Sequence, residues 1–248
     1  MRYFFEISFD GTNYHGWQSQ KNAVSIQEVI ESSISTILNK TIKITGAGRT
    51  DAGVHAKQMY FHLDSDEIKD IPLTQFNLNN YLPKDISILS INKVYKNAHA
   101  RFDAVSREYE YVVINKKNCF LNNKAYLIQQ KLDVEKMNLA ANILLKTRNF
   151  TSFCKMHSDV KTYICKVSKS EWVFVKEKLI YRIVADRFLR NMVRAIVGTL
   201  LEVGLGKLSV NKFENIVDSK NRSLAGMSAP AQGLYLKKIL YPKNIFNE

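Results

Sequence analysis

The spacing of apolar residues along the first hundred positions predicts a succession of strands and helices. An aromatic-rich run at residues 3–9 indicates a strand, and isoleucines at 26, 30, 34 and 37 recur at the spacing of one helix face. Ser25 and Glu28 form a capping box, so we expect that helix to span 26–38. The pattern then predicts strands at 41–45 and 57–63, a helix at 73–81 that stops before Pro83, and a strand at 86–95.

The second half of the chain repeats this order with longer parts. The predicted elements are a strand at 108–114, a helix at 134–146 after an Asp133 cap, strands near 162–167 and at 179–185 with a further strand or hairpin arm at 171–176, a helix at 187–203 and a strand at 234–240. Each half therefore has the β-α-β-β-α-β order of the ferredoxin-like arrangement. We expect an α+β protein of two ferredoxin-like subdomains, 1–97 and 98–248, joined at 96–103. Their sheets would join edge to edge into one extended antiparallel sheet, with helices on one side and a groove between the halves.

The composition adds a preference for an anionic partner. The chain has 248 residues, 46% of them apolar, which is enough to build a sizeable core. Lys and Arg number 36 against 23 Asp and Glu, a formal net charge of +13. Such an excess favours a polyanion such as nucleic acid, because each neutralised phosphate releases condensed counterions. Charge alone is equally compatible with a soluble basic protein that binds no nucleic acid.

The cysteines and histidines indicate neither a disulfide framework nor a metal site. Cys119, Cys154 and Cys165 form no CxxC pair, so we expect reduced thiols in a cytoplasmic protein. The five histidines have no Cys or carboxylate companion at ligand spacing, and we expect no bound metal. The acidic Glu6 comes too early for a signal peptide, and the longest apolar stretch, 195–201, is too short to span a membrane.

A glycine-rich loop between the predicted strands at 41–45 and 57–63 is the first candidate site. Gly46, Gly48 and Gly53 enclose Arg49 and Asp51. Glycines allow positive φ or a close backbone approach, so the loop could present both charged side chains to a ligand at a strand end. A hairpin in which the two side chains simply pair with each other is an equally good interpretation of the loop alone.

The predicted helix at 187–203 offers a second candidate. Arg187, Arg190 and Arg194 fall within one narrow sector at the border of its apolar face. They form either a solvated flank or a set of anion contacts, since a guanidinium at a core boundary is expensive unless it meets an anion.

Five groups of residues spread over nearly the whole chain carry a family resemblance. They are Asp10-Gly11-Thr12-Asn13-Tyr14-His15-Gly16-Trp17-Gln18, Gly48-Arg49-Thr50-Asp51-Ala52-Gly53-Val54-His55, His99-Ala100-Arg101-Phe102 with Arg107-Glu108-Tyr109-Glu110-Tyr111, Phe188-Leu189-Arg190-Asn191-Met192-Val193-Arg194, and Gly233-Leu234-Tyr235-Leu236. In order and spacing they resemble the tRNA pseudouridine synthase A family. The resemblance implies an isomerase that converts uridine to pseudouridine at positions 38, 39 and 40 of the anticodon arm of tRNA. It also implies a basic RNA cleft between the halves, no small-molecule cofactor, and a homodimer in which one tRNA touches both subunits.

The resemblance also gives roles to single residues. It makes Asp51 the nucleophile, Arg194 the partner that keeps this carboxylate ionised, and Arg49 the side chain that fills the space left by the extracted uridine. Tyr109 would lie against the target base and could assist proton transfer from C5, although the spacing of Tyr109 and Tyr111 alone favours two residues that simply line one face of a strand. A carboxylate can attack C1′, attack C6 or abstract a ribose proton, and the sequence favours none of the three.

Further RNA contacts are expected on the flanks of this site. Arg187 and Arg190 would face the RNA, as would Tyr14 and Gln18 by stacking or hydrogen bonding, whereas Trp17 is better explained as a hydrophobic plug. The lysines elsewhere, including Lys116, Lys117 and Lys124, are solvated or loosely phosphate-facing. Residues 150–172 and 225–230 resemble the family only loosely, which leaves the shape of the cleft and the choice of tRNA open.

Two other functions are compatible with parts of the pattern. A non-catalytic protein with two RRM-like sheets would share the predicted topology, but the sequence has no RNP1 pattern of the form Lys/Arg-Gly-Phe-Gly-Phe. A metal-dependent nuclease would need two or more carboxylates near Asp51, and the loop provides one.

Overall fold

The computed structural model describes residues 1–156 and 160–246, which form two compact units. Unit 1 consists of Met1–Val105 together with Tyr235–Glu248, and unit 2 of Ser106–Leu234. These bounds differ from the subdomains 1–97 and 98–248, because residues 98–105 and the C-terminal strand belong to unit 1. The mixed α+β class with a mostly antiparallel sheet is confirmed.

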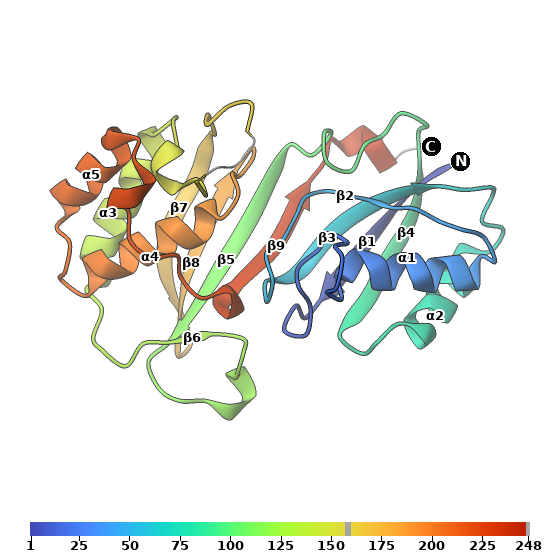
Figure 1. The fold of residues 1–248 in the computed structure, drawn as a ribbon, viewed down its shortest axis with the longest axis horizontal. Coiled ribbons are helices and arrows are strands. Elements are labelled where there is room, and N and C mark those ends of the chain that lie inside the picture. Colours follow the sequence, from blue (N-terminus) through green and yellow to red (C-terminus); the bar gives the residue numbers. More distant parts are fainter. Residues whose placement is uncertain (157–159, 247–248) are drawn as a thin grey trace. The chain divides into compact units, whose positions relative to one another are not determined.

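In the part of unit 1 that the structure describes, the helices and strands follow the expected order, and the C-terminal strand joins their sheet (Figure 1). The elements are β1 (Arg2–Phe9), α1 (Ile26–Ile37), β2 (Thr45–Gly46), β3 (His55–Asp64), α2 (Ile71–Tyr81), β4 (Ile86–Val94) and β9 (Leu234–Leu240). Strand β1 lies between β4 and β3 and is antiparallel to both. Strand β2 pairs antiparallel with the distal end of β3, and β9 pairs in parallel with its first residues.

The core of unit 1 lies between α1 and the sheet. Ile26, Ile30 and Ile34 are buried as their spacing predicts, and the rings of Phe5 and Phe61 stack at 4.9 Å between centroids on β1 and β3. The α1 cap is also confirmed, because the Ser25 hydroxyl accepts the Glu28 amide.

The strand predicted at 41–45 is wrong except for its last residue. The amides at 42 and 44 are taken by side chains of α1 and do not enter the sheet: Ile42 donates to the Ser35 hydroxyl at 3.0 Å, and Ile44 to the Glu31 carboxylate at 3.1 Å. Burial by itself would raise the pKa of Glu31, but hydrogen bonds from Lys43, Gln27 and the Ile44 amide hold that pKa below its usual value.

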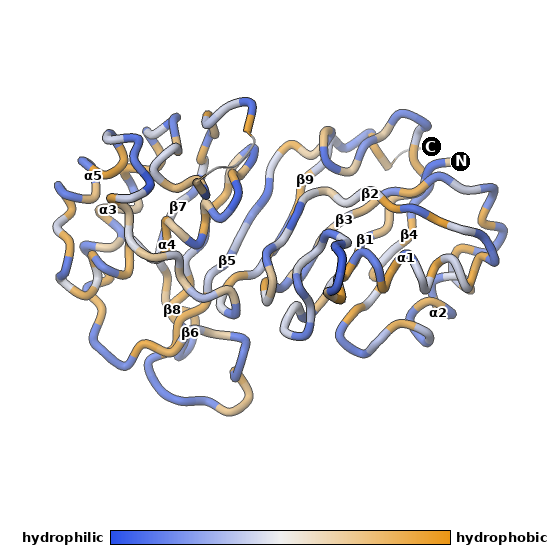
Figure 2. Tube along the Cα trace, in the orientation of Figure 1, coloured by the Kyte–Doolittle hydropathy of each residue, from blue (hydrophilic) through white to orange (hydrophobic). Residues whose placement is uncertain are grey.

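Unit 2 is built from a three-stranded antiparallel sheet, a short extra strand and three helices. The elements are β5 (Ser106–Ile114), β6 (Tyr126–Leu127), α3 (Val134–Lys146), β7 (Val167–Val175), β8 (Lys178–Ala185), α4 (Met192–Gly204) and α5 (Val210–Ser219). Strand β8 lies between β5 and β7, and β6 runs parallel to β5. Helix α3 matches its prediction and begins at the Asp133 cap. Figure 2 shows the connection between β5 and β6 as a mostly hydrophilic loop with a short apolar stretch.

Two predictions for unit 2 are wrong. The segment at 162–166 contains only an isolated bridge between Asn149 and Ile164, and the regular strand begins at Val167. The helix predicted at 187–203 begins at Met192, because Asn191 before it has φ 65°, a left-handed conformation outside the helix. The chain turns out of β8 at Asp186, whose carboxylate accepts the amides of Lys166 and Arg187.

Candidate active site

The loop at residues 47–54, which carries Arg49 and Asp51, connects β2 to β3 in unit 1. Arg49 is exposed and Asp51 is half-buried. The Ala47 amide donates to the Tyr60 carbonyl at 2.8 Å, and the Val54 amide to the carbonyl of Asp51 at 3.2 Å. The backbone on both sides of Asp51 is therefore fixed.

A second loop, residues 10–18, interlocks with the 47–54 loop. The Trp17 amide donates to the Thr50 carbonyl and the Gly53 amide to the Tyr14 carbonyl, both at 3.2 Å. Gly16 has φ +90°, and a Cβ atom there would lie 2.4 Å from the Thr50 oxygen. The two motifs that the sequence shows forty residues apart thus form one structure, and the glycine lets their backbones approach.

His55 fixes the base of these loops. Its buried ring accepts the Gly11 amide at Nδ1 (3.1 Å), and the same nitrogen lies 3.0 Å from the Asp10 carboxylate. The His55 ring stacks on Tyr235 of β9 at 4.6 Å between centroids, and the Lys57 ammonium lies 5.3 Å from the centre of the Tyr235 ring. Burial and the nearby Asp10 raise the pKa of the Tyr235 phenol. Tyr235 belongs to a quoted motif, but its stacking on His55 was not predicted, because the two are 180 residues apart in sequence.

The RNA-stacking role expected for Tyr14 needs correction. Tyr14 is 7% exposed, and its hydroxyl donates to the Asp85 carboxylate at 2.6 Å. Burial, followed by the Asp85 hydrogen bond, raises the pKa of this phenol. This burial and the Asp85 hydrogen bond favour a structural role for Tyr14 over stacking on a base. Trp17 is a buried plug as expected, and Gln18 is exposed.

In unit 2, Tyr109 lies on β5 opposite Ile183 and is half-buried. Its ring meets the Phe188 ring edge to face, with 5.0 Å between centroids and 84° between planes. Tyr111 on the same strand is fully buried, and its hydroxyl donates to the Pro230 carbonyl at 2.8 Å. The two tyrosines therefore differ: Tyr111 is a core residue, and Tyr109 keeps part of its ring accessible. The sequence did not predict Phe188 as the ring partner of Tyr109, although Phe188 is the first residue of the motif at 188–194.

Arg194 lies in the first turn of α4 and is half-buried. Its Nε donates to the Ala229 carbonyl at 2.8 Å, while its own carbonyl accepts the Ala229 amide at 2.9 Å. The segment that holds it packs closely on α4, since a Cβ atom at Gly198 would lie 1.7 Å from the Met227 oxygen. The tract at 225–230, which resembles the family loosely, therefore positions Arg194.

The prediction that Arg187, Arg190 and Arg194 lie on one side of a single helix is wrong, because only Arg194 belongs to α4. Arg187 and Arg190 precede α4, the first half-buried and the second exposed. Lys116, Lys117 and Lys124 are exposed in the loop between β5 and β6, as expected of solvated or phosphate-facing lysines.

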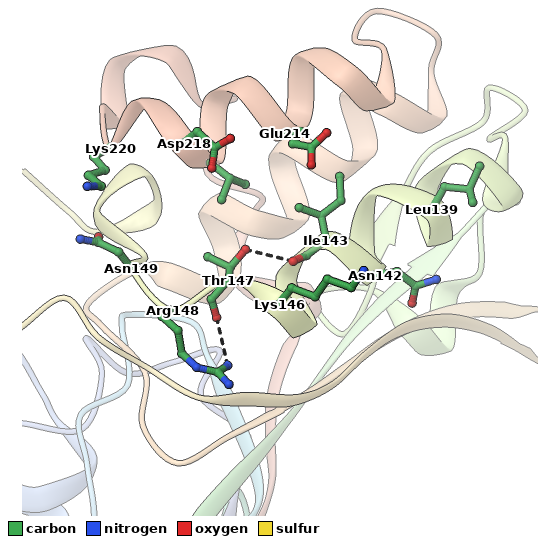
Figure 3. A pocket seen from close by; sticks show the side chains of 11 residues that line it. Leu139, Asn142, Ile143, Lys146, Thr147, Arg148, Asn149, Glu214, Asp218 and Lys220 are labelled. Carbon is green, nitrogen blue, oxygen red and sulfur yellow. Dashed lines mark hydrogen bonds between the residues drawn. The ribbon is translucent and has the colours of Figure 1, made fainter.

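A pocket in unit 2 is lined by none of the predicted site residues (Figure 3). This pocket of about 680 Å³ is lined by residues of α3, α5 and the segment after α3. Lys146, Arg148 and Lys220 face it together with Glu214 and Asp218, so its charges are mixed. Its composition does not indicate a ligand.

Neither a metal centre nor a membrane-spanning helix is seen in the part of the chain that the structure describes. Within residues 1–156 and 160–246, no group of three or more His, Cys, Asp or Glu side chains could hold a metal ion. No helix among these residues is both long and apolar enough to cross a membrane.

Comparison with known proteins agrees with the motif resemblance. A family model described as tRNA pseudouridine synthase matches residues 7–103 and 140–242. The tRNA pseudouridine synthase A of Bacteroides fragilis is 50% identical over 247 residues, covering 99% of this chain and 98% of that protein. The proteins of the same name from Bacteroides thetaiotaomicron and Acetivibrio thermocellus are 48% and 38% identical, covering 100% and 95% of this chain and 93% and 97% of their own. The resemblance is confirmed, and the chain belongs to the tRNA pseudouridine synthase family, a family of isomerases that act on tRNA.

Proposed function

We propose that this protein isomerises uridine to pseudouridine at positions 38, 39 and 40 in the anticodon stem-loop of tRNA, with Asp51 as the nucleophile. The observation that carries the proposal is the interlocked pair of loops, which hold a half-buried carboxylate in a fixed backbone. A loop that served only as a hairpin would not need a second loop docked on it through Gly16.

The reaction suits a single carboxylate. The N-glycosidic bond is cleaved, the uracil turns, and a new bond joins its C5 to C1′ of the ribose, with no net oxidation or reduction. An ionised Asp51 can begin this sequence by attack on C1′, by attack on C6, or by removal of a ribose proton. The first two routes use Asp51 as the nucleophile, as proposed, and the third would use it as a base; all three need the same carboxylate.

Three further side chains complete the proposed chemistry. Arg49 is exposed beside Asp51 and fills the space of the extracted uridine, which lowers the few kcal/mol that flipping costs. The accessible part of the Tyr109 ring packs against the target base. The Arg194 Nε donates to the Ala229 carbonyl, which fixes the direction of the guanidinium, and we assign its positive charge as the partner of the Asp51 carboxylate. Arg187, Arg190 and Gln18 contact the RNA.

The proposal retains the features expected from the family resemblance alone. These are two ferredoxin-like halves with a basic RNA cleft, a cytoplasmic homodimer in which one tRNA touches both subunits, and a reaction without metal or cofactor.

The test is mass-spectrometric mapping of pseudouridine in unmodified tRNA incubated with the purified protein. We expect product at positions 38 to 40 with the wild type and none with Asp51→Asn, while tRNA affinity stays within about threefold, because phosphate contacts supply most of it. Asp66→Asn, at an exposed aspartate of unit 1, is the matched control and should retain full activity. Turnover by Asp51→Asn, product elsewhere in the tRNA, or complete loss of activity in EDTA would each refute part of the proposal.

A further inference from the structure

The turn at residues 99–103 of unit 1 presents an aromatic ring to solvent in a constrained setting. Phe102 is 72% exposed, and the Arg101 guanidinium carbon lies 5.6 Å from the centre of its ring. A single exposed apolar side chain needs no explanation by itself. The network of hydrogen bonds that holds Phe102 in this exposed position does need an explanation.

Side chains of the turn accept hydrogen bonds from the turn's own backbone amides. The His99 amide donates to the Asp103 carboxylate at 2.8 Å, and the Asp103 amide returns to the His99 carbonyl at 3.1 Å. The Nδ1 atom of the His99 ring accepts the amides of Arg101 at 3.1 Å and Phe102 at 3.4 Å. The backbone of both residues is thereby turned inward.

A second layer lies beneath the turn. The Ala100 amide donates to Nδ1 of the buried His62 on β3 at 3.2 Å, and the rings of His62 and His99 meet at 4.7 Å between centroids. The Ala100 carbonyl accepts the hydroxyl of Tyr241, and the Ala98 carbonyl accepts a guanidinium nitrogen of Arg2 at 2.8 Å. Two histidines, a tyrosine and an arginine thus fix the backbone of a turn whose exposed tip is Phe102.

We propose that this turn is an RNA-contacting platform: Phe102 stacks on an unpaired nucleobase of the tRNA, and Arg101 contacts the adjoining phosphate. The inference rests on the proposed function for the identity of the RNA. Every base has a flat π face, so an aromatic ring backed by a guanidinium is a general acceptor for unpaired nucleotides. A rigid turn loses little conformational entropy when it binds. The chain as a whole has a net charge of +13, which favours a polyanionic partner, and Arg101 supplies a positive charge beside the Phe102 ring.

The platform is separate from the nucleophile loop. His55 begins β3 beside that loop, and His62 lies seven residues further along the same strand. At about 3.3 Å per residue, the turn lies roughly 23 Å along the strand from the loop. The base that stacks on Phe102 is therefore a different nucleotide from the reacting uridine.

The test measures the dissociation constant of unmodified tRNA for variants prepared in the Asp51→Asn background, so that no product forms. Phe102→Ala should weaken binding roughly five- to hundredfold, the range found when a base loses an aromatic stacking partner. Phe102→Trp should bind at least as tightly as the parent, because it keeps a ring, and Phe102→Leu should behave like Phe102→Ala. Phe76→Ala on α2 is the matched control, at a phenylalanine of the same unit that is 63% exposed, and should bind like the parent.

Three outcomes would overturn the inference. They are unchanged affinity in Phe102→Ala, equal affinity in Phe102→Leu and Phe102→Trp, or a changed sedimentation coefficient in Phe102→Ala with unchanged tRNA affinity, which would make the turn a contact between copies of this chain. Thermal melting checks that the variants fold. If Phe102→Ala weakens binding but the wild type makes no pseudouridine, the contact stands and the proposed function fails. The reverse pattern refutes only the contact.

Discussion

Replacing Gly16 by alanine tests whether the interlocked loops hold Asp51 in place. Gly16 has φ +90°, which costs an L-residue about 1–2 kcal/mol. The new Cβ atom would also lie 2.4 Å from the Thr50 oxygen, and relieving such an overlap costs roughly 1–3 kcal/mol. The two terms together predict a loss of about 2–5 kcal/mol in the free energy of unfolding of unit 1.

Gly48→Ala is the matched control within the same pair of loops. A Cβ atom at Gly48 meets nothing within 4 Å, and its φ is not positive. The same chemical change should therefore leave stability unchanged or raise it by about 0.4–1 kcal/mol, since alanine restricts the unfolded chain.

Urea unfolding followed by tryptophan fluorescence measures this difference. Each unit has one tryptophan, Trp17 in the 10–18 loop and Trp172 on β7. Trp172→Phe leaves Trp17 as the reporter of unit 1, and both glycine variants are made in that background. Because the clash falls on the Thr50 carbonyl, Gly16→Ala should also slow pseudouridine formation at saturating tRNA. Equal stability of the Gly16→Ala and Gly48→Ala proteins would refute the steric reasoning, and an unchanged rate in Gly16→Ala would refute the link to Asp51.

Two other predictions concern acid stability and catalysis. Burial, with Arg2, lowers the pKa of His62 to about 4, against the opposing effect of Asp64 and Asp103, and burial also lowers the pKa of His99. The unfolded chain takes up these protons first, so the free energy of unfolding should be level above about pH 6.5 and fall by up to about 3 kcal/mol for His62 as the pH drops to about 4. Urea melts across this range check it, and an equally steep slope in His62→Gln would contradict it. Arg194→Ala should lower the single-turnover rate of pseudouridine formation by at least about tenfold, with a smaller change in tRNA affinity. Weaker binding with a normal rate, and a smaller dependence of affinity on salt concentration, would indicate a phosphate contact instead.

The sequence predicts those helices and strands whose apolar periodicity and cap residues lie within the element itself. Helix α3 has an apolar face and the Asp133 cap, and both its ends were predicted. Helix α5 was missed although Phe213, Ile216 and Val217 recur at helical spacing after the Ser209 cap, so its signal was present in the sequence. The start of α4 could not be found in the same way, because the apolar pattern extends back into residues 187–191, and the helix begins only after the left-handed Asn191.

The candidate site likewise has a part that the sequence predicts and a part that it does not. Arg49 and Asp51 could be named from one short motif, whereas the docking of residues 10–18 on their loop depends on contacts between segments far apart in sequence. The Tyr14 hydroxyl bonds Asp85, 71 residues away in sequence, and the stacking of His55 on Tyr235 joins segments 180 residues apart. Such pairings are decided by packing in three dimensions, and no local periodicity encodes them.

The parallel pairing of β9 with β3 has a consequence for how the protein is made. Strand β3 and the loop before it are synthesised before unit 2, but the strand that pairs with His55 and Ala56 is synthesised after it. N-terminal parts of a chain usually fold first during synthesis. Unit 1 cannot follow this rule completely, because its sheet lacks β9 until unit 2 has been synthesised. Until then, the start of β3 is an unpaired edge that can join a wrong strand. The first residues of β3, which follow the carboxylate loop, thus receive their pairing strand only after unit 2 has been synthesised.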